Sequence, residues 1–168
     1  MIKVGSLFSG IGGIDLGFEQ AGFEIVWAND MDAEACKTYR HNFPNTQLIE
    51  GDVRDIDPRT LPDIDVLVAG FPCQPFSVLG KQRGFDDPRG QLFFEIARIV
   101  KEKRPQVVFL ENVKNFASHD NGQTLKVVRT IMTELGYSFD AKVLNAVYYG
   151  IPQKRERIYM VCFREDID

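Results

Sequence analysis

The stretch Ile2-Lys3-Val4-Gly5-Ser6-Leu7-Phe8-Ser9-Gly10-Ile11-Gly12-Gly13-Ile14-Asp15 decides the fold of this chain. Its apolar first half predicts a buried strand, and a glycine-rich turn follows that strand directly. The apolar residues after the turn recur at mostly helical spacing, as far as the helix-ending Gly22. A strand joined to a helix by a short turn is the repeating unit of α/β proteins, so we expect a chain of this class.

The alternation of strand and helix patterns continues almost to the last residue. Further strands are expected at 23–28, 47–50, 65–70, 106–110, 138–145 and 157–163, and helices at 14–21, 32–43, 92–100 and 124–135. This order predicts a Rossmann-like, doubly wound, mostly parallel sheet with helices on both faces. The connection between the last two strands, residues 146–156, is too short for a crossover helix, so these strands should form an antiparallel hairpin.

Length and composition indicate one soluble globular domain over residues 1–168. The chain is 44% hydrophobic and 26% charged, which is ordinary for such a domain. No apolar run approaches the roughly 20 residues that span a bilayer, and no secretory signal is evident, so we expect no membrane partner. Three dispersed cysteines and two histidines predict neither a metal site nor a disulfide framework. The expected location is the reducing cytoplasm.

Charge argues against strong nucleic-acid binding by this chain alone. The net charge is −4, whereas binding to a phosphate backbone needs a basic surface. Basic residues do gather locally, in one loop with Lys81, Arg83 and Arg89 and in another with Lys154, Arg155 and Arg157. Such loops are usually only solvated, and the alternative is a local contact with phosphate.

The first glycine-rich turn has the context of a nucleotide-type cofactor loop, because it follows a strand and opens a helix. It is not a strict GxGxxG pattern, since Asp15 stands where the third glycine would be. An acidic residue there would repel a pyrophosphate, so the pattern favours S-adenosylmethionine over NAD. Glycines in such a turn are often only structural, so this pattern alone does not decide the cofactor.

Acidic side chains follow the second and third strands. Asp30 could accept hydrogen bonds from ribose hydroxyls, whereas Asp32 is better placed to cap the next helix. Met31 could lie against an adenine ring through its thioether. Asp52, followed by Val53, could meet the adenine amino group. These residues predict a nucleoside site at the carboxyl edge of the sheet.

A cysteine stands between two prolines directly after the fourth strand, in Gly70-Phe71-Pro72-Cys73-Gln74-Pro75-Phe76. A thiol that serves packing needs no rigid backbone on either side, and ligands of α/β proteins bind where strands end. We therefore predict that Cys73 is a nucleophile. Cys36 and Cys162 lie in apolar helix and strand patterns and are expected to be small buried hydrophobes.

Two further motifs supply groups for acid catalysis and for anion or carbonyl binding. Glu111-Asn112-Val113 closes the apolar fifth strand, where desolvation should keep a carboxyl protonated and able to donate to a ring nitrogen. The alternative is a glutamate satisfied by loop amides. Gln153-Lys154-Arg155-Glu156-Arg157 precedes the last strand and offers donors suited to a carbonyl oxygen or a phosphate. Its alternative is a strand entrance of alternating charge.

These motifs, in their order and spacing, resemble those of the cytosine-C5 DNA methyltransferases. The resemblance covers almost the whole chain and is carried by Phe8 to Gly13, Gly70 to Ser77, Glu111 to Val113 and Gln153 to Arg157. It implies the class I methyltransferase fold, S-adenosylmethionine as cofactor and double-stranded DNA as substrate. It also implies a bacterial or phage-encoded origin, in a restriction-modification system.

The resemblance implies a role for each matching residue. Cys73 would add to C6 of a flipped-out cytosine, Glu111 would protonate N3, and Arg157 would hold O2. Asn112 would brace the Cys73 loop, and Arg155 would assist near the base or its phosphate. The implied cofactor residues are Phe8, Gly10, Ile11, Gly12, Asp30, Met31, Asp52, Val53 and Leu92. The implied DNA contacts are Gln74, Ser77, Lys81 and Arg83.

The chain departs from the family pattern in two respects. Met31 stands where many relatives have an aromatic residue. The family also continues into a target-recognition region and a final helix, so we expect a truncated chain or one half of a split enzyme that needs a partner chain. The alternatives are a cofactor-binding module that is inactive alone and an RNA-directed relative, although the residues after Cys73 favour DNA. A NAD-linked dehydrogenase would leave Cys73, Glu111 and Arg157 without a role.

Overall fold

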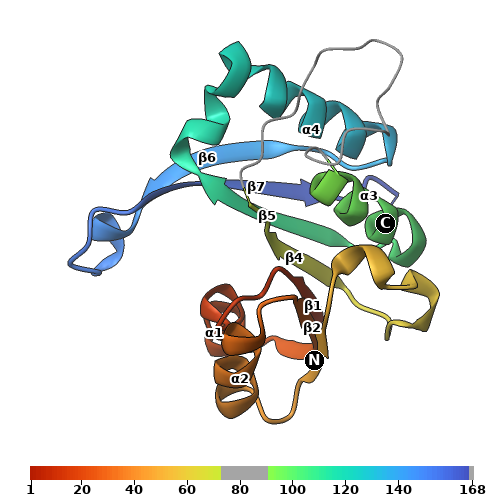
Figure 1. Ribbon diagram of the computed structural model, residues 1–168. Coiled ribbons are helices and arrows are strands. Elements are labelled where there is room, and N and C mark those ends of the chain that lie inside the picture. Colours follow the sequence, from red (N-terminus) through yellow and green to blue (C-terminus); the bar gives the residue numbers. More distant parts are fainter. Residues whose placement is uncertain (73–90, 167–168) are drawn as a thin grey trace.

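One sheet of seven strands organises the computed structural model, which describes residues 1–72 and 91–166 (Figure 1). The strands are β1 (Lys3–Leu7), β2 (Glu24–Asp30), β3 (Gln47–Glu50), β4 (Val66–Gly70), β5 (Val107–Val113), β6 (Asp140–Asn145) and β7 (Glu156–Phe163). Their order in the sheet is β3-β2-β1-β4-β5-β7-β6. The first five strands are parallel, and β7 pairs antiparallel with both β5 and β6. The predicted parallel sheet and terminal hairpin are therefore confirmed.

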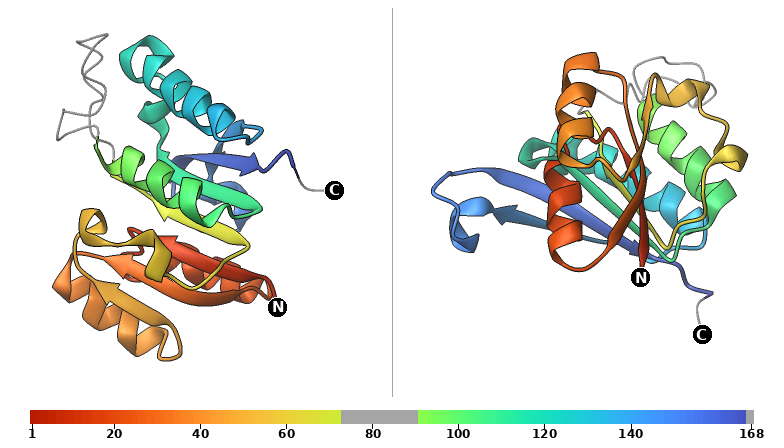
Figure 2. Two further views of the ribbon diagram at one scale, coloured as in Figure 1. Left: turned by 90° about the vertical axis from the view of Figure 1, so that its right-hand side faces the viewer. Right: turned by 90° about the horizontal axis from the view of Figure 1, so that it is seen from below.

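Four α-helices cover the two faces of the sheet in the described residues (Figure 2). They are α1 (Gly13–Gln20), α2 (Ala33–Asn42), α3 (Gln91–Lys103) and α4 (Gln123–Glu134). Figure 2 shows α1 and α2 on one face and α3 and α4 on the other, which is the doubly wound arrangement. None of the described helices is both long and apolar enough to cross a membrane.

Short 3₁₀ turns, which the sequence patterns did not predict, connect several elements. They are η1 (Val53–Asp55), η2 (Pro58–Thr60), η3 (Lys114–Ala117), η4 (His119–Gly122) and η5 (Ala146–Tyr149). The first two occupy the connection between β3 and β4. The last lies at the tip of the β6–β7 hairpin, which extends away from the sheet (Figure 1).

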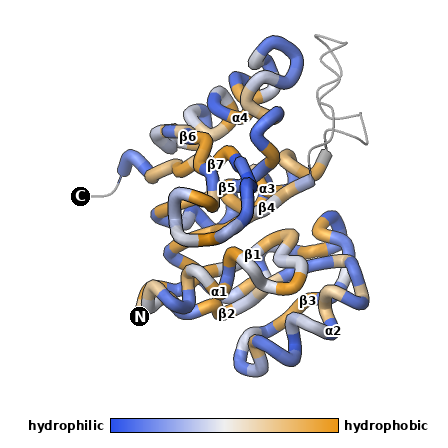
Figure 3. Tube along the Cα trace, turned by 90° about the vertical axis from the view of Figure 1, so that its left-hand side faces the viewer, coloured by the Kyte–Doolittle hydropathy of each residue, from blue (hydrophilic) through white to orange (hydrophobic). Residues whose placement is uncertain are grey.

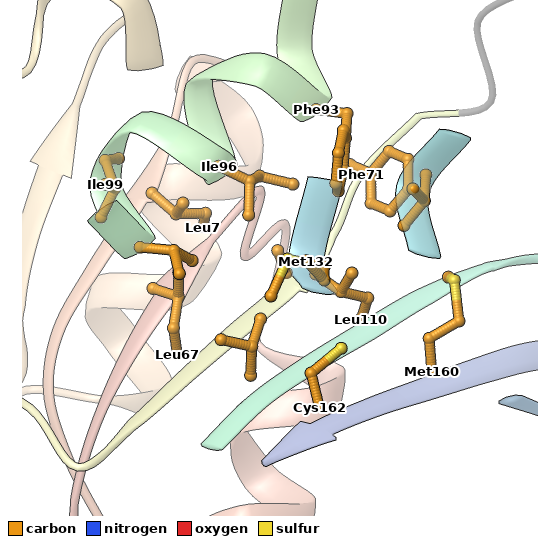
Figure 4. Packing of buried hydrophobic residues seen from close by; sticks show 14 of the residues in the cluster. Leu7, Leu67, Phe71, Phe93, Ile96, Ile99, Leu110, Met132, Met160 and Cys162 are labelled. Carbon is orange, nitrogen blue, oxygen red and sulfur yellow. The ribbon is translucent and has the colours of Figure 1, made fainter. Parts of the chain in front are cut away.

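The larger part of the core lies between the sheet and the pair α3 and α4. Leu67 and Leu110 of the central strands pack there with Ile96 and Met132 of the helices (Figure 4). Cys162 is buried in the same cluster, as predicted from its apolar strand. In Figure 3 hydrophobic and hydrophilic residues alternate along α4, as a helix with one buried face requires.

One local contact and one distant contact explain where the first two helices begin. Asp32 caps α2, because its Oδ1 accepts a hydrogen bond of 2.8 Å from the Ala35 amide. Gly12 precedes α1 with a φ of +93°, and a β-carbon there would overlap the ring of Phe43. The predicted cap at Asp32 is confirmed, whereas the contact that requires glycine at position 12 involves a residue far along the chain.

The fifth strand is longer than its sequence pattern predicted. The pattern ended the strand at Leu110, but pairing with β7 extends β5 to Val113. Glu111 pairs with Tyr159, so Glu111 is a residue of the strand itself and not of the loop that follows it. The strand boundary was wrong because β7, nearly 50 residues later, supplies the hydrogen bonds that extend the strand.

Candidate active site

A pocket of about 310 Å³ opens where the parallel strands β1 to β4 end. Its volume lies in the range of small-molecule sites, roughly 300–1,000 Å³. It is lined by Phe8, Asn29, Asp30, Met31, Gly51, Asp52, Val53, Gly70, Pro72 and Leu92. The structure thus brings together six of the nine predicted cofactor residues, namely Phe8, Asp30, Met31, Asp52, Val53 and Leu92.

The turn of residues 8–12, called the glycine turn below, forms one side of this pocket. Phe8 lines the pocket with a φ of +54°, a left-handed conformation that is rare for a bulky residue. Such a conformation costs of the order of 1–3 kcal/mol and persists only where surrounding contacts impose it. Two of those contacts are hydrogen bonds to β2, from the Ser9 amide to the Asn29 carbonyl and from the Gly10 amide to the Asp30 carboxylate.

The other predicted members of the glycine turn do not line the pocket. Gly10 has a φ of +56° and open space where a side chain would stand. Gly12 faces the Phe43 ring instead, so its contact is with the residue that follows α2. The Ile11 side chain is 60% exposed. Of these three positions, only Gly10 therefore leaves room for a ligand against its backbone.

Asp30 ties the glycine turn to the end of β2. Its Oδ2 accepts a hydrogen bond of 2.7 Å from the Gly10 amide, and its Oδ1 accepts one of 2.9 Å from the Asp32 amide. A carboxylate can accept more than one hydrogen bond at each oxygen, so Asp30 retains the capacity to bind hydroxyl groups. Its neighbour Met31 is 71% exposed at the mouth of the pocket.

Asp52, on the far wall of the pocket, already has a partner. It accepts hydrogen bonds from the amide and the guanidinium of Arg54, and these bonds lower the pKa of Asp52 to about 2. The carboxylate is therefore charged and oriented by Arg54. Any ligand amino group at this wall would share the carboxylate with that arginine.

Asn29 is a pocket residue that the sequence patterns missed. It is buried, and its Nδ2 donates hydrogen bonds of 2.8 and 2.9 Å to the carbonyls of Ile49 and Gly51. These bonds join the end of β2 to the end of β3 and fix the floor between Asp30 and Asp52. The available signal was a polar side chain inside an apolar strand, which seldom occurs without a hydrogen-bonding role.

Glu111 lies close to Gly70, which is one of the residues that line the pocket. A β-carbon on Gly70 would stand 3.5 Å from Glu111 Oε2, so a side chain at position 70 would be in van der Waals contact with the carboxyl. Glu111 Oε1 also lies 3.1 Å from Arg157 Nε, and the two side chains are only 18% and 23% exposed. Its partner is thus an arginine rather than loop amides.

The protonation of Glu111 reflects two opposing causes. Burial raises the pKa of the carboxyl above its ordinary value, while the charges of Arg157 and Arg155 lower it. Burial is the larger effect, so the pKa is raised, in the direction that the apolar strand predicted. Arg155 itself is exposed, and its amide donates to the Asn145 side chain at the base of the hairpin.

Asn112 connects β5 to the segment that follows β4. Its buried Nδ2 donates a hydrogen bond of 2.9 Å to the Phe71 carbonyl, two residues before Cys73 in the sequence. The predicted nucleophile Cys73 and the predicted DNA contacts Gln74, Ser77, Lys81 and Arg83 lie outside the described residues.

The argument against a pyrophosphate assumed that Asp15 faces a ligand bound at the glycine turn. In the structure, Asp15 points into the protein instead. It is 1% exposed, and its two oxygens accept hydrogen bonds of 2.7 Å from Ser6 Oγ and Tyr39 OH. The repulsion argument was therefore wrong, because this carboxyl is turned into the protein. Among the described residues, no group of His, Cys, Asp or Glu side chains is arranged to hold a metal ion.

Comparison with known proteins shows the family of this chain. Residues 2–168 match the family model for C-5 cytosine-specific DNA methylases. The chain is 60% identical over 162 residues to Type II methyltransferase M.HhaI of Haemophilus parahaemolyticus, covering 96% of this chain and 49% of that protein. It is 54% identical over 167 residues to Type II methyltransferase M.Bsp6I of Bacillus sp. (strain RFL6), covering 98% and 53%.

Solved structures show the same fold. A Spodoptera frugiperda DNMT2 mutant superposes with a TM-score of 0.81 at 28% identity, over 99% of this chain and 51% of that one. A putative DNA modification methyltransferase encoded within an Escherichia coli prophage superposes with a TM-score of 0.82 at 28% identity, over 100% and 49%. The chain spans about half the length of the curated relatives it matches. It belongs to the family of C-5 cytosine-specific DNA methylases.

Proposed function

We propose that this chain carries the catalytic centre for transfer of a methyl group from S-adenosylmethionine to C5 of cytosine in double-stranded DNA. The observation that carries the proposal is the Glu111–Arg157 ion pair, whose carboxyl lies close to Gly70, a residue that lines the pocket. An acid and a fixed donor next to a nucleoside-sized pocket can act on a base that carries a ring nitrogen and a carbonyl oxygen.

The pocket residues fit S-adenosylmethionine. Asp30 offers a carboxylate for the ribose hydroxyls, and Met31, Val53 and Leu92 offer apolar contacts for the adenine ring. The open space against Gly10 leaves room for a ligand close to the backbone. Bound there, S-adenosylmethionine would supply an electrophilic methyl group.

The chain's own residues would make C5 of cytosine reactive. The thiolate of Cys73 adds to C6 of the base, while the Glu111 carboxyl gives its proton to N3 and Arg157 donates a hydrogen bond to O2. The electron pair released into the ring makes C5 the nucleophile that accepts the methyl group. Loss of the C5 proton to a base, expulsion of the Cys73 thiolate and return of the N3 proton to the Glu111 carboxylate then leave 5-methylcytosine.

Other residues would position the reactants. Asn112 holds the Phe71 carbonyl and would thereby fix the start of the Cys73 segment. The target base must leave the duplex to reach Glu111, and Arg155 is exposed where it could contact the base or its phosphate. The proposed DNA contacts are Gln74, Ser77, Lys81 and Arg83.

The relatives support a biological setting for this chemistry. Type II methyltransferases of bacteria are the matching proteins, so we place the activity in a bacterial restriction-modification system, in the cytoplasm where the DNA is. The net charge of −4 supports the further proposal that DNA recognition needs basic residues supplied by a C-terminal recognition region or by a partner chain.

The decisive experiment uses DNA in which the target base is 5-fluorocytosine. The fluorine replaces the C5 proton, so the reaction should stop at the covalent adduct. We expect the full-length protein, incubated with this DNA and S-adenosylmethionine, to form an adduct that resists denaturation and maps to Cys73. Cys73→Ala should abolish the adduct, and Cys36→Ala, which changes a buried thiol on α2, should leave it. An adduct that survives Cys73→Ala would refute the proposed mechanism.

A further inference from the structure

Three buried polar side chains from three elements meet beneath the glycine turn. Asp15, in the first turn of α1, accepts hydrogen bonds from Ser6 of β1 and Tyr39 of α2, each 2.7 Å long. All three side chains are buried. No step of the proposed reaction uses them. We propose that Asp15 is a positioning residue for the cofactor pocket, which it shapes by holding the glycine turn through Ser6 and Tyr39.

The first path from Asp15 to the pocket runs through β1. Ser6 stands two residues before Phe8, at the end of the strand that leads into the turn. Its hydroxyl is held by Asp15 Oδ1, which fixes the strand end against α1. Phe8 then adopts its left-handed conformation in the pocket wall. Because such a conformation must be imposed by its surroundings, the anchor at Ser6 is one of the contacts that maintain it.

The second path runs through α2. Tyr39, held by Asp15 Oδ2, stacks on Phe43 with ring centroids 4.5 Å apart and planes 26° apart. The Phe43 ring in turn occupies the space beside Gly12, the last residue of the glycine turn. The Asp15–Tyr39 hydrogen bond therefore fixes the stacked rings of Tyr39 and Phe43, and the Phe43 ring contacts the turn at Gly12.

Both sets of contacts connect the glycine turn to α1 and α2, whereas its own hydrogen bonds connect it to β2. A buried carboxyl costs free energy unless each oxygen has a partner, and here Ser6 and Tyr39 supply both partners. Loss of either donor leaves a buried acceptor unpaired, so the turn should relax toward other conformations. The cofactor affinity should then fall, although no ligand-contacting residue has changed.

The test compares two buried tyrosines in different parts of the fold. Tyr39 and Tyr137 are both fully buried, and each donates one hydrogen bond of 2.7 Å, Tyr137 to the Pro105 carbonyl away from the pocket. Tyr39→Phe should weaken S-adenosylmethionine binding, measured by calorimetry on the full-length protein, by about 3- to 10-fold. It should also speed amide hydrogen exchange in residues 9–12. Tyr137→Phe should lower the melting temperature comparably and change neither quantity.

The outcomes separate this inference, which rests on the proposed function, from that function itself. Equal effects of Tyr39→Phe and Tyr137→Phe on affinity and on exchange in the glycine turn would overturn the positioning role. If the unsubstituted protein binds no S-adenosylmethionine, the proposed function fails, and exchange in the turn still decides whether Asp15 holds it. Ser6→Ala tests the other path and should act in the same direction as Tyr39→Phe.

Discussion

Glu111 Oε1 and Arg157 Nε lie 3.1 Å apart, between two strands that run antiparallel. The arginine opposes the effect of burial on the carboxyl, and the same arginine is the proposed donor to the base. The protonation of Glu111 therefore depends on where the Arg157 guanidinium lies. A change in one residue should be visible in the other.

Replacing Arg157 should raise the pKa of Glu111 further. Arg157→Met removes the arginine that lowers this pKa more strongly than Arg155 does, so the effect of burial is opposed by Arg155 alone. The carboxyl should then titrate at a higher pH in a ¹³C NMR titration of labelled glutamate. Arg40→Met, which removes the partner of Glu50 at the sheet edge, is the control and should leave Glu111 unchanged.

Replacing Glu111 should slow the chemical step without weakening cofactor binding. Glu111→Gln keeps the shape of the side chain but cannot give up a proton, and loss of general acid catalysis costs about 10²–10⁴-fold in rate. The expected result is a fall of that size in the single-turnover methylation rate, with unchanged affinity for S-adenosylmethionine in calorimetry. A parallel fall in affinity would show that Glu111 acts through the pocket instead.

Alanine at the two turn glycines should separate stability from binding. Gly12→Ala combines a left-handed backbone with overlap of the Phe43 ring, so the free energy of unfolding should fall by about 2–5 kcal/mol. Gly10→Ala meets no neighbour and should cost about 1–2 kcal/mol for its backbone alone. Because the space beside Gly10 is the proposed cofactor site, Gly10→Ala should nevertheless weaken S-adenosylmethionine binding. Urea unfolding and calorimetry would measure the two quantities.

Two buried asparagines should prove to serve different halves of the site. Asn29→Ala removes the donor to two partly buried carbonyls and Asn112→Ala the donor to one buried carbonyl, at a cost of about 1–3 kcal/mol per group. Asn29→Ala should weaken S-adenosylmethionine binding, because the pocket floor loses its link between β2 and β3. Asn112→Ala should spare that affinity and slow adduct formation with 5-fluorocytosine DNA. Identical profiles for the two variants would contradict this division.

Asp15 and Asp52 should contribute to stability with opposite dependence on pH. Burial raises the pKa of Asp15 above its ordinary 3.8, so its contribution is most favourable below that value and declines as the pH rises through the folded pKa. Arg54 lowers the pKa of Asp52 to about 2, so its contribution is present above 3.8 and is lost as the pH falls through about 2. Urea unfolding of Asp15→Asn and Asp52→Asn across pH should show difference curves of opposite slope.

Local patterns predicted the features that depend on neighbouring residues. The cap at Asp32 followed from one capping preference, and the direction of the Glu111 pKa followed from four apolar residues before it. Both depend on residues within a few positions of the acid. The pocket followed similarly, since strand ends in a parallel sheet meet at one edge.

Contacts between distant residues explain what the patterns missed. Asp15 is buried because Tyr39, 24 residues later, supplies a hydroxyl, and no local pattern indicates that partner. Pairing with β7 extends β5, and β7 lies between β5 and β6 although it is last in the chain. Asn29 donates to the carbonyls of Ile49 and Gly51, which are 20 and 22 residues later in the chain. Such partners are set by the packed fold.

Gly70 also limits how this protein can be redesigned. Its backbone lines the pocket, and any β-carbon there would stand 3.2 Å from Ile14 Cδ1 and 3.5 Å from Glu111 Oε2. A side chain at this position would crowd Ile14 and fill the space beside the Glu111 carboxyl. Engineering for bulkier alkyl donors should therefore begin at the outer rim, where Met31 and Leu92 can be trimmed, and leave position 70 untouched.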